Sequence, residues 1–322
     1  MKLFLARVFL AVGICLGGIS YTSGCDFCNL YLSIQPNDYQ HSLGVQYRFR
    51  NYRAWVTQSG VTPSLRTEHG GNHIFIDADE PVLVEEAYRS YEVWGRFFIR
   101  PEWQVFASVA YAENLLLNDE KIVDHLNGIT DLTLLSFYQV TNTISDSVDH
   151  RFRQRLLLGG GLKLPTGTYK IPTDGEIDYQ MQPGTGSLDF LLSSNYLAQW
   201  RRFGFNGLIT YRFNTKNDLG FTFANRFNLN ADVFYQLRFS GWTLQPQTGL
   251  YFEHAERDVL QGKLVEGTGG RVLFSAMGGI IYRGRFSLGI HYQSPLTEEL
   301  HDIQLPNRER WIAGLTYYIP GK

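Results

Sequence analysis

Apolar and polar side chains alternate along this chain from residue 42 to near its end. In the clearest segment, residues 225–237, every second side chain is apolar and most of the intervening ones are Arg, Asn, Asp or Gln. Successive side chains of a β-strand point to opposite faces of the sheet. The pattern therefore predicts strands with one apolar and one polar face. It occurs in twelve segments, which are residues 42–51, 88–99, 103–111, 130–140, 151–164, 187–200, 205–213, 225–237, 242–252, 272–282, 286–292 and 311–319.

Short and long connections alternate between these segments. Residues 201–202, 239–241 and 284 leave room for little more than a turn. The long connections are residues 53–81, 113–127, 165–186, 215–224, 253–269 and 294–309. Short turns at one end and long loops at the other are typical of transmembrane barrels. We therefore expect an all-β fold, an antiparallel up-and-down transmembrane β-barrel of about twelve strands that spans residues 42–319.

Aromatic residues lie near the ends of these segments, where barrels in bacterial outer membranes carry girdles at the two membrane surfaces. The candidate girdle residues are Tyr47, Phe97, Trp103, Tyr196, Trp200, Tyr211, Tyr235, Trp242, Tyr282, Tyr292, Trp311 and Tyr317. A soluble barrel with an apolar interior is the alternative interpretation of the same alternation. The number and length of the strands favour the membrane barrel.

The composition supports a β-rich fold. Aromatic residues make up 15% of the 322 residues, and the chain contains 32 Gly and only 3 Met. Abundant Tyr, Phe and Gly with few helix formers favours strands and turns. The formal net charge of −2 argues against general nucleic-acid binding, which usually needs a basic surface.

Residues 1–24 have the features of a cleaved export signal. Lys2 and Arg7 supply positive charge, and residues 8–19 are apolar but too few to cross a bilayer comfortably as a helix. An N-terminal membrane anchor is the alternative. Since no later segment resembles a transmembrane helix and only helices and closed barrels satisfy the backbone in lipid, an exported membrane form must be a barrel. We expect it in the outer membrane.

Residues 25–41 form an N-terminal segment that begins with a cysteine pair, Cys25 and Cys28. Signal cleavage after Ser20 or after Gly24 would leave both in the mature protein. A disulfide between them fits the oxidising periplasm, and lipid modification of Cys25 is the other option. Two cysteines are too few for a zinc site, so no metal site is predicted.

The polar faces, which we assign to the barrel interior, carry more basic than acidic side chains. The candidate lumen-lining residues are Arg48, Arg50, Arg96, Asp131, Arg151, Arg153, Arg155, Asp189, Arg212, Arg226, Asp232 and Arg271, and the same faces carry Lys163, Arg283, Arg310, Glu92 and Glu253. Rings of Arg and Lys favour anions in pores. The predicted function is a channel or transporter for small solutes, anionic or hydrophobic. In the alternative, the charges pair and fill a narrow barrel that has a structural or gated role.

An outer-membrane lipid-modifying enzyme is a further alternative. Ser287 and His291 share an inward face, but about 13 Å separates them along the strand, which is beyond hydrogen-bond reach. The chain contains no Gly-x-Ser-x-Gly motif. No catalytic residue and no cofactor is therefore predicted. The expected partners are those of any outer-membrane barrel: the lipid bilayer, lipopolysaccharide, the barrel-assembly machinery and an unidentified small solute.

Three motifs carry a resemblance to a known family. Residues 159–167 read Gly-Gly-Gly-Leu-Lys-Leu-Pro-Thr-Gly, residues 182–189 read Gln-Pro-Gly-Thr-Gly-Ser-Leu-Asp, and residues 128–132 read Gly-Ile-Thr-Asp-Leu. Together with Cys25-Asp26-Phe27-Cys28 they resemble the transporter-like outer-membrane β-barrel proteins of the phenol-degradation (meta-pathway) type. The resemblance covers roughly residues 25–319. It implies an outer-membrane barrel with a transport function, and it does not specify the solute.

The motifs also have a physical interpretation. Pro165 and Gly167 end a strand, and residues 183–186 return the chain to the next one. They therefore frame a loop of residues 166–185. Two interpretations stay open: the motifs serve only as strand terminators, or the loop folds over the pore mouth.

Overall fold

The computed structural model describes residues 40–56, 81–144, 151–173, 175–301 and 304–319. The signal peptide, Cys25 and Cys28 lie outside the described residues. The strands are β1 (Ser42–Val56), β2 (Val82–Arg100), β3 (Trp103–Asn118), β4 (Lys121–Ile129), β5 (Leu132–Asn142), β6 (Phe152–Leu164), β7 (Asp189–Trp200), β8 (Phe203–Phe213), β9 (Phe221–Thr222), β10 (Arg226–Tyr235), β11 (Leu237–Phe239), β12 (Trp242–Ala255), β13 (Val259–Leu260), β14 (Lys263–Leu264), β15 (Gly270–Arg283), β16 (Phe286–Leu300) and β17 (Asn307–Tyr318). Within the described residues, no helix is long and apolar enough to cross a membrane.

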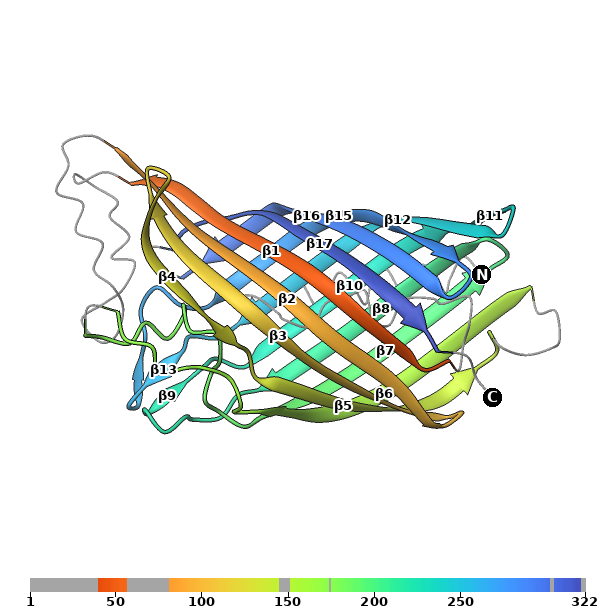
Figure 1. Ribbon diagram of the computed structural model, residues 1–322, viewed down its shortest axis with the longest axis horizontal. Coiled ribbons are helices and arrows are strands. Elements are labelled where there is room, and N and C mark those ends of the chain that lie inside the picture. The colour runs from red at the N-terminus through yellow and green to blue at the C-terminus, as the bar shows by residue number, and fades with distance from the viewer. Residues whose placement is uncertain (1–39, 57–80, 145–150, 174, 302–303, 320–322) are drawn as a thin grey trace, which may run out of the picture.

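The strands form one closed antiparallel barrel (Figure 1). Strands consecutive along the chain pair with each other, and β1 closes the ring on β17, with Val45 opposite Leu315. Twelve strand positions surround the lumen, because β4 and β11 continue the paths of β5 and β10 beyond a break. The predicted up-and-down barrel of about twelve strands is confirmed.

The alternation in the sequence separates an outer apolar face from an inner polar face. In β1, Leu43 and Val45 are 44% and 51% exposed, whereas Ser42 and Gln46 are 0% and 3% exposed. Exposed apolar side chains of this kind cover the outside of the barrel, which suits contact with lipid chains and not with water. The outer face thus rules out the soluble barrel with an apolar interior.

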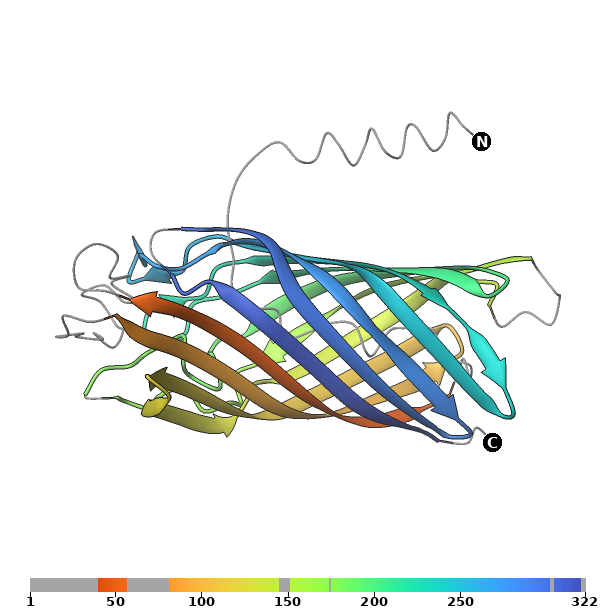
Figure 2. The same ribbon diagram turned by 90° about the horizontal axis from the view of Figure 1, so that it is seen from above.

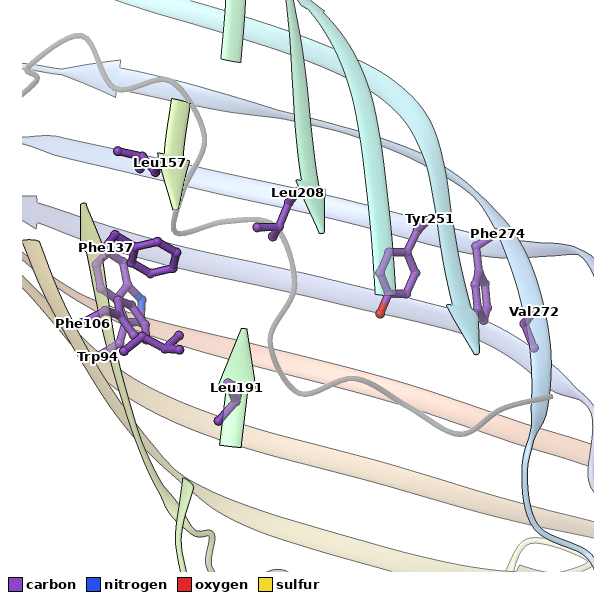
Figure 3. Packing of buried hydrophobic residues seen from close by; sticks show 10 residues of the cluster. Trp94, Phe106, Phe137, Leu157, Leu191, Leu208, Tyr251, Val272 and Phe274 are labelled. Carbon is purple, nitrogen blue, oxygen red and sulfur yellow. The ribbon is translucent and has the colours of Figure 1, made fainter. Parts of the chain in front are cut away.

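Strand β15 departs from this rule, because both of its faces are apolar. Val272, Phe274 and Ile280 are buried on the inner face, while Met277 and Ile281 are exposed on the outer one. Val272 and Phe274 belong to a cluster of apolar side chains that point into the barrel from several strands (Figure 3).

Three sequence predictions for β15 are therefore wrong. Arg283 does not line the lumen, because it shares the outward alternation of Met277 and Ile281 and is exposed. Arg271 does not line the lumen: it takes the outward alternation, and its Nη2 lies 2.6 Å from Glu299 Oε2. Tyr282 is not a girdle residue, since it is 5% exposed in an interior cluster with Ile280 and Tyr318. Where apolar residues occupy both faces of a strand, the alternation cannot tell inside from outside.

The two ends of the barrel have different connections (Figures 1 and 2). We call the end with residues 101–102, 201–202, 240–241 and 284 the short-turn end, and the opposite end the loop end. At the loop end β9, β13 and β14 form a small separate sheet. The predicted long connection at residues 113–127 is wrong, because β3 and β4 continue as a hairpin there. Its turn residues Asp119 and Glu120 have φ of 46° and 65°, and the turn lacks the Asn-Gly or Asp-Gly pair that marks most hairpins of this kind.

Candidate functional site

The three sequence motifs meet at one buried ion cluster at the loop end of the lumen. Lys163, the penultimate residue of β6, lies directly opposite Asp189, the first residue of β7. Its Nζ is 2.6 Å from Asp189 Oδ2 and 2.9 Å from Asp131 Oδ2, just ahead of β5. All three side chains are at most 7% exposed. One ammonium group thus links two carboxylates, and each of the three residues comes from a different motif.

This cluster also fixes the base of the connection between β6 and β7, residues 165–188, which we call the mouth loop. The backbone N–H groups of Gly167 and Thr185 donate to the two oxygens of Asp131, each at 2.9 Å. The hydroxyl of Thr185 donates to Oδ2 at 2.7 Å. A charged acceptor with several donors is a strong and directional anchor. The motifs therefore do more than end strands: they tie both ends of the mouth loop to one carboxylate.

Glycine is required where the two ends of the mouth loop cross. A Cβ on Gly167 would lie 2.8 Å from the backbone N of Asp131, and one on Gly184 would lie 2.8 Å from the backbone of Gly167. Neither backbone neighbour can rotate away as a side chain would. The Gly in each motif thus permits the close approach on which the Asp131 contacts depend.

The tip of the mouth loop is bound to opposite sides of the barrel. On one side Met181 is fully buried among apolar residues that include Leu116 and Leu305, and Asn114 Nδ2 donates to its carbonyl at 2.8 Å. On the other side the ring of Tyr179 stacks on Phe221 at a centroid distance of 4.2 Å. The loop therefore folds across the lumen mouth, as the second of the two sequence interpretations proposed.

Asp258 joins the mouth loop to the connection between β12 and β13. Its carboxylate accepts hydrogen bonds from the backbone N–H of Ala224, at 2.7 Å, and from Gln180 Nε2 in the mouth loop. Burial raises the pKa of Asp258, and the nearby charge of Arg226 and these hydrogen bonds oppose that rise. No sequence pattern pointed to Asp258, Tyr179 or Gln180, since their roles depend on contacts between distant loops.

A cavity of about 230 Å³ lies between the mouth loop and the barrel wall. Its lining has more basic than acidic residues: Arg48, Arg50, Arg89, Lys163, Arg212 and Arg226 against Glu86, Glu92 and Asp131. Within the lining Arg48 Nη2 is 2.7 Å from Glu92 Oε2, and Lys163 is held in the ion cluster. Tyr179, Gln180 and Gln182 of the mouth loop complete the wall. The cavity thus has a net basic lining next to the mouth loop.

The structure places the predicted lumen residues in four groups. Five of them line the cavity: Arg48, Arg50, Asp131, Arg212 and Arg226. Arg96, Arg155, Asp189 and Asp232 are buried on inward-facing strand positions, and Arg153 is half-buried on the same face of β6 as Arg155. Arg151 is exposed ahead of β6, at the short-turn rim, because the strand begins one residue later. Arg271 lies on the outer face.

Ser287 and His291 have separate partners inside the barrel. The hydroxyl of Ser287 lies 3.0 Å from that of Tyr318, and His291 Nδ1 lies 3.2 Å from Gln247 Nε2. Among the described residues, no group of three or more His, Cys, Asp or Glu is arranged to hold a metal ion.

Comparison with known proteins places this geometry in context. The family model described as "Putative MetA-pathway of phenol degradation" matches residues 52–299. An outer-membrane channel from Pseudomonas putida F1 is similar in structure, with a TM-score of 0.58, 11% identity, and coverage of 89% of this chain and 100% of that one. The β domain of the Bordetella autotransporter BrkA aligns with a TM-score of 0.47 and 10% identity, over 88% of this chain and 100% of that one. No curated protein sequence matches the chain. The fold is thus that of outer-membrane β-barrels.

Proposed function

The chain belongs to the family described as the putative MetA pathway of phenol degradation, and we propose that it is an outer-membrane channel for small solutes that favours anions. In this proposal an export signal in residues 1–24 directs the chain to the periplasm, and the barrel then inserts with its apolar face toward lipid. The similar fold of the Pseudomonas putida channel supports a channel function for this chain.

The observation that carries the anion preference is the charge of the cavity at the lumen mouth. Six basic residues line it against three acidic ones, and the lining includes Arg212 and Arg226 of neighbouring strands. Because the surrounding wall excludes much of the water, basic side chains there attract anions more strongly than they would at an open surface. The mouth loop narrows this passage and so limits the size of the solute.

Ion permeation through the reconstituted full chain tests the proposal. In planar bilayers with a KCl gradient, the reversal potential of the wild type should report a higher permeability for Cl⁻ than for K⁺. The double variant Arg212→Gln/Arg226→Gln should bring the two permeabilities closer together. The matched control is Lys170→Gln/Lys263→Gln, which removes two exposed charges at the loop end outside the cavity and should leave selectivity unchanged.

Two outcomes would contradict the proposal. A preference for cations in the wild type would show that the basic cavity does not select the permeant ion. The absence of conductance from barrels that show the heat-modifiable gel migration of a folded protein would favour the closed-barrel alternative. Buried ion pairs such as Arg310 with Glu253, 2.7 Å apart, are what that alternative predicts.

A further inference from the structure

Each hairpin at the short-turn end has at least one arginine in its described residues, either in the turn or near the end of a flanking strand. The arginines are Arg100, Arg151, Arg201, Arg202, Arg238, Arg283 and Arg285, and all seven are exposed. We call them the arginine ring. Glu102 is the one exposed acidic residue in the described part of this end. None of the seven forms an ion pair with another described residue.

A belt of exposed aromatic residues borders the arginine ring on the side of the barrel wall. Trp103, Phe152, Trp200, Phe203, Phe239 and Phe286 are each 47–60% exposed at the first or last position of their strands. Such aromatic belts lie at the boundary between lipid chains and headgroups. The guanidinium groups of Arg201 and Arg283 lie over Trp200 and Trp242, at 5.4 and 4.5 Å from the ring centroids. Arg151, Arg201, Arg202 and Arg285 are each one residue beyond the belt. Arg100 and Arg283 pair with the belt residues Trp103 and Phe286, and Arg238 directly precedes Phe239. The arginine ring therefore lies at or next to the belt, near the level of the headgroups.

We propose that the arginine ring binds anionic phospholipid headgroups in the leaflet around the short turns. The inference rests on the proposed location of the barrel in the outer membrane. A guanidinium group binds phosphate oxygens through paired N–H donors. It is also weakly hydrated and stacks on aromatic rings, which suits the boundary between lipid chains and headgroups. A zwitterionic headgroup carries an ammonium group that offsets its phosphate charge, so the ring prefers headgroups with net negative charge.

The distribution of the ring identifies lipid as the occupant. The arginines occur on the turns after β2, β5, β7, β11 and β15, which are spread around the barrel and not collected on one side. An annulus of lipid contacts the whole circumference, whereas a protein partner would need a contiguous patch. Since the short turns of bacterial barrels face the periplasm, the leaflet concerned is the inner, phospholipid leaflet.

Spin-label electron paramagnetic resonance on the reconstituted full chain tests this proposal. Phosphatidylglycerol and phosphatidylcholine carrying a nitroxide on the acyl chain are compared in phosphatidylcholine bilayers, and the fraction immobilised at the protein surface is measured. We expect a relative association constant of about three for phosphatidylglycerol, falling toward one at about 1 M salt as the charges are screened. The variant Arg201→Gln/Arg202→Gln/Arg283→Gln/Arg285→Gln should lose most of the preference.

Two further variants separate the ring from a general effect of charge. Lys121→Gln/Lys170→Gln/Lys216→Gln/Lys263→Gln removes the same charge from exposed positions at the loop end and should keep the full preference. Glu102→Gln, which removes an acidic residue beside the ring, should increase it. No preference in the wild type, or equal losses in the two fourfold variants, would overturn the proposal. The measurement does not depend on conductance, so the channel function can fail without affecting it.

Discussion

The loop end and the short-turn end of the barrel are built on opposite principles. At the loop end charges are buried and paired, as in the cluster of Lys163 with Asp131 and Asp189. At the short-turn end seven exposed arginines stand against one exposed acidic residue, Glu102, and the arginines have no ion-pair partner among the described residues. Exposed charges at the loop end are mixed, with seven acidic residues, Asp119, Glu120, Glu176, Asp218, Glu256, Glu266 and Glu299, against five basic ones, Lys121, Lys170, Lys216, Lys263 and Arg308.

The difference separates charges that hold structure from charges that face the surroundings. A buried ion pair fixes geometry because either member left alone is costly in a low-dielectric interior. An exposed charge contributes little to stability and instead acts on what approaches the surface. The loop end thus uses charge to position the mouth loop, while the short-turn end keeps its charge available to ligands.

The largest expected effect follows from breaking the ion cluster with Lys163→Met. The variant leaves the carboxylates of Asp131 and Asp189 buried without their cation, which should cost about 3–5 kcal/mol of unfolding free energy. Urea titration of the reconstituted barrel, followed by tryptophan fluorescence, measures the loss. The control is Lys170→Met, whose pair with Asp218 is 50% and 56% exposed and should matter far less. Similar losses for both variants would show that the cluster does not anchor the loop.

A somewhat smaller effect is expected when the crossing of the mouth loop is crowded. Gly167→Ala places a Cβ within 2.8 Å of two backbone atoms, of Thr130 and Asp131, and the strain should cost about 2–3 kcal/mol. At the short-turn end, Gly284→Ala meets no atom within 4 Å, and only the positive φ of 55° opposes it, at about 1 kcal/mol. The same urea titrations compare the two. A larger loss for Gly284→Ala would contradict the requirement for close approach at Gly167.

The barrel itself could be predicted from the sequence because the alternation within each strand separates the residues of its two faces. The inward positions of Arg48, Arg212 and Arg226 follow from local alternation alone, since their neighbours on the other face are apolar. The same reasoning failed for Arg271, where β15 is apolar on both faces, and it missed the β3–β4 hairpin because Asp119 and Glu120 do not mark a turn.

The mouth of the lumen could be predicted only in part, because its contacts depend on register and on distant loops. The motifs framed residues 166–185 correctly as one loop. That Lys163 faces Asp189 depends on the pairing of β6 with β7, which short sequence patterns do not encode. The contacts of Tyr179 with Phe221 and of Met181 with Leu305 join segments far apart in the chain, so no local signal could identify them.

A pH dependence is expected at the loop end and not at the short-turn end. Because burial raises the pKa of Asp258 in the folded protein, its neutral form favours the folded mouth loop, and this contribution is lost as pH rises through the raised pKa. As the pH rises above about 4, the ordinary pKa of Asp, hydrogen exchange in residues 176–183 should therefore accelerate by more than intrinsic exchange alone explains. In Asp258→Asn that excess should vanish. An unchanged excess in the variant would assign the dependence to another group.

The smallest effect on stability is expected at the short-turn end. It tests directly whether the exposed arginines, unlike the buried charges at the loop end, leave the stability of the barrel unchanged. Arg283 and Arg285 flank the turn at Gly284 and are exposed, so the double variant Arg283→Gln/Arg285→Gln should change the unfolding free energy by no more than about 0.5 kcal/mol. The contact of Arg283 with Trp242 opposes this expectation.

Urea titration in phosphatidylcholine bilayers, which lack anionic headgroups, isolates the contribution of the protein. A loss comparable to that of Lys163→Met would mean that the arginines stabilise the barrel itself, and the two ends would then differ only in the sign of their charge. A near-zero change in these bilayers, with a larger loss in bilayers containing phosphatidylglycerol, is the result that separates structural charge from charge that binds lipid.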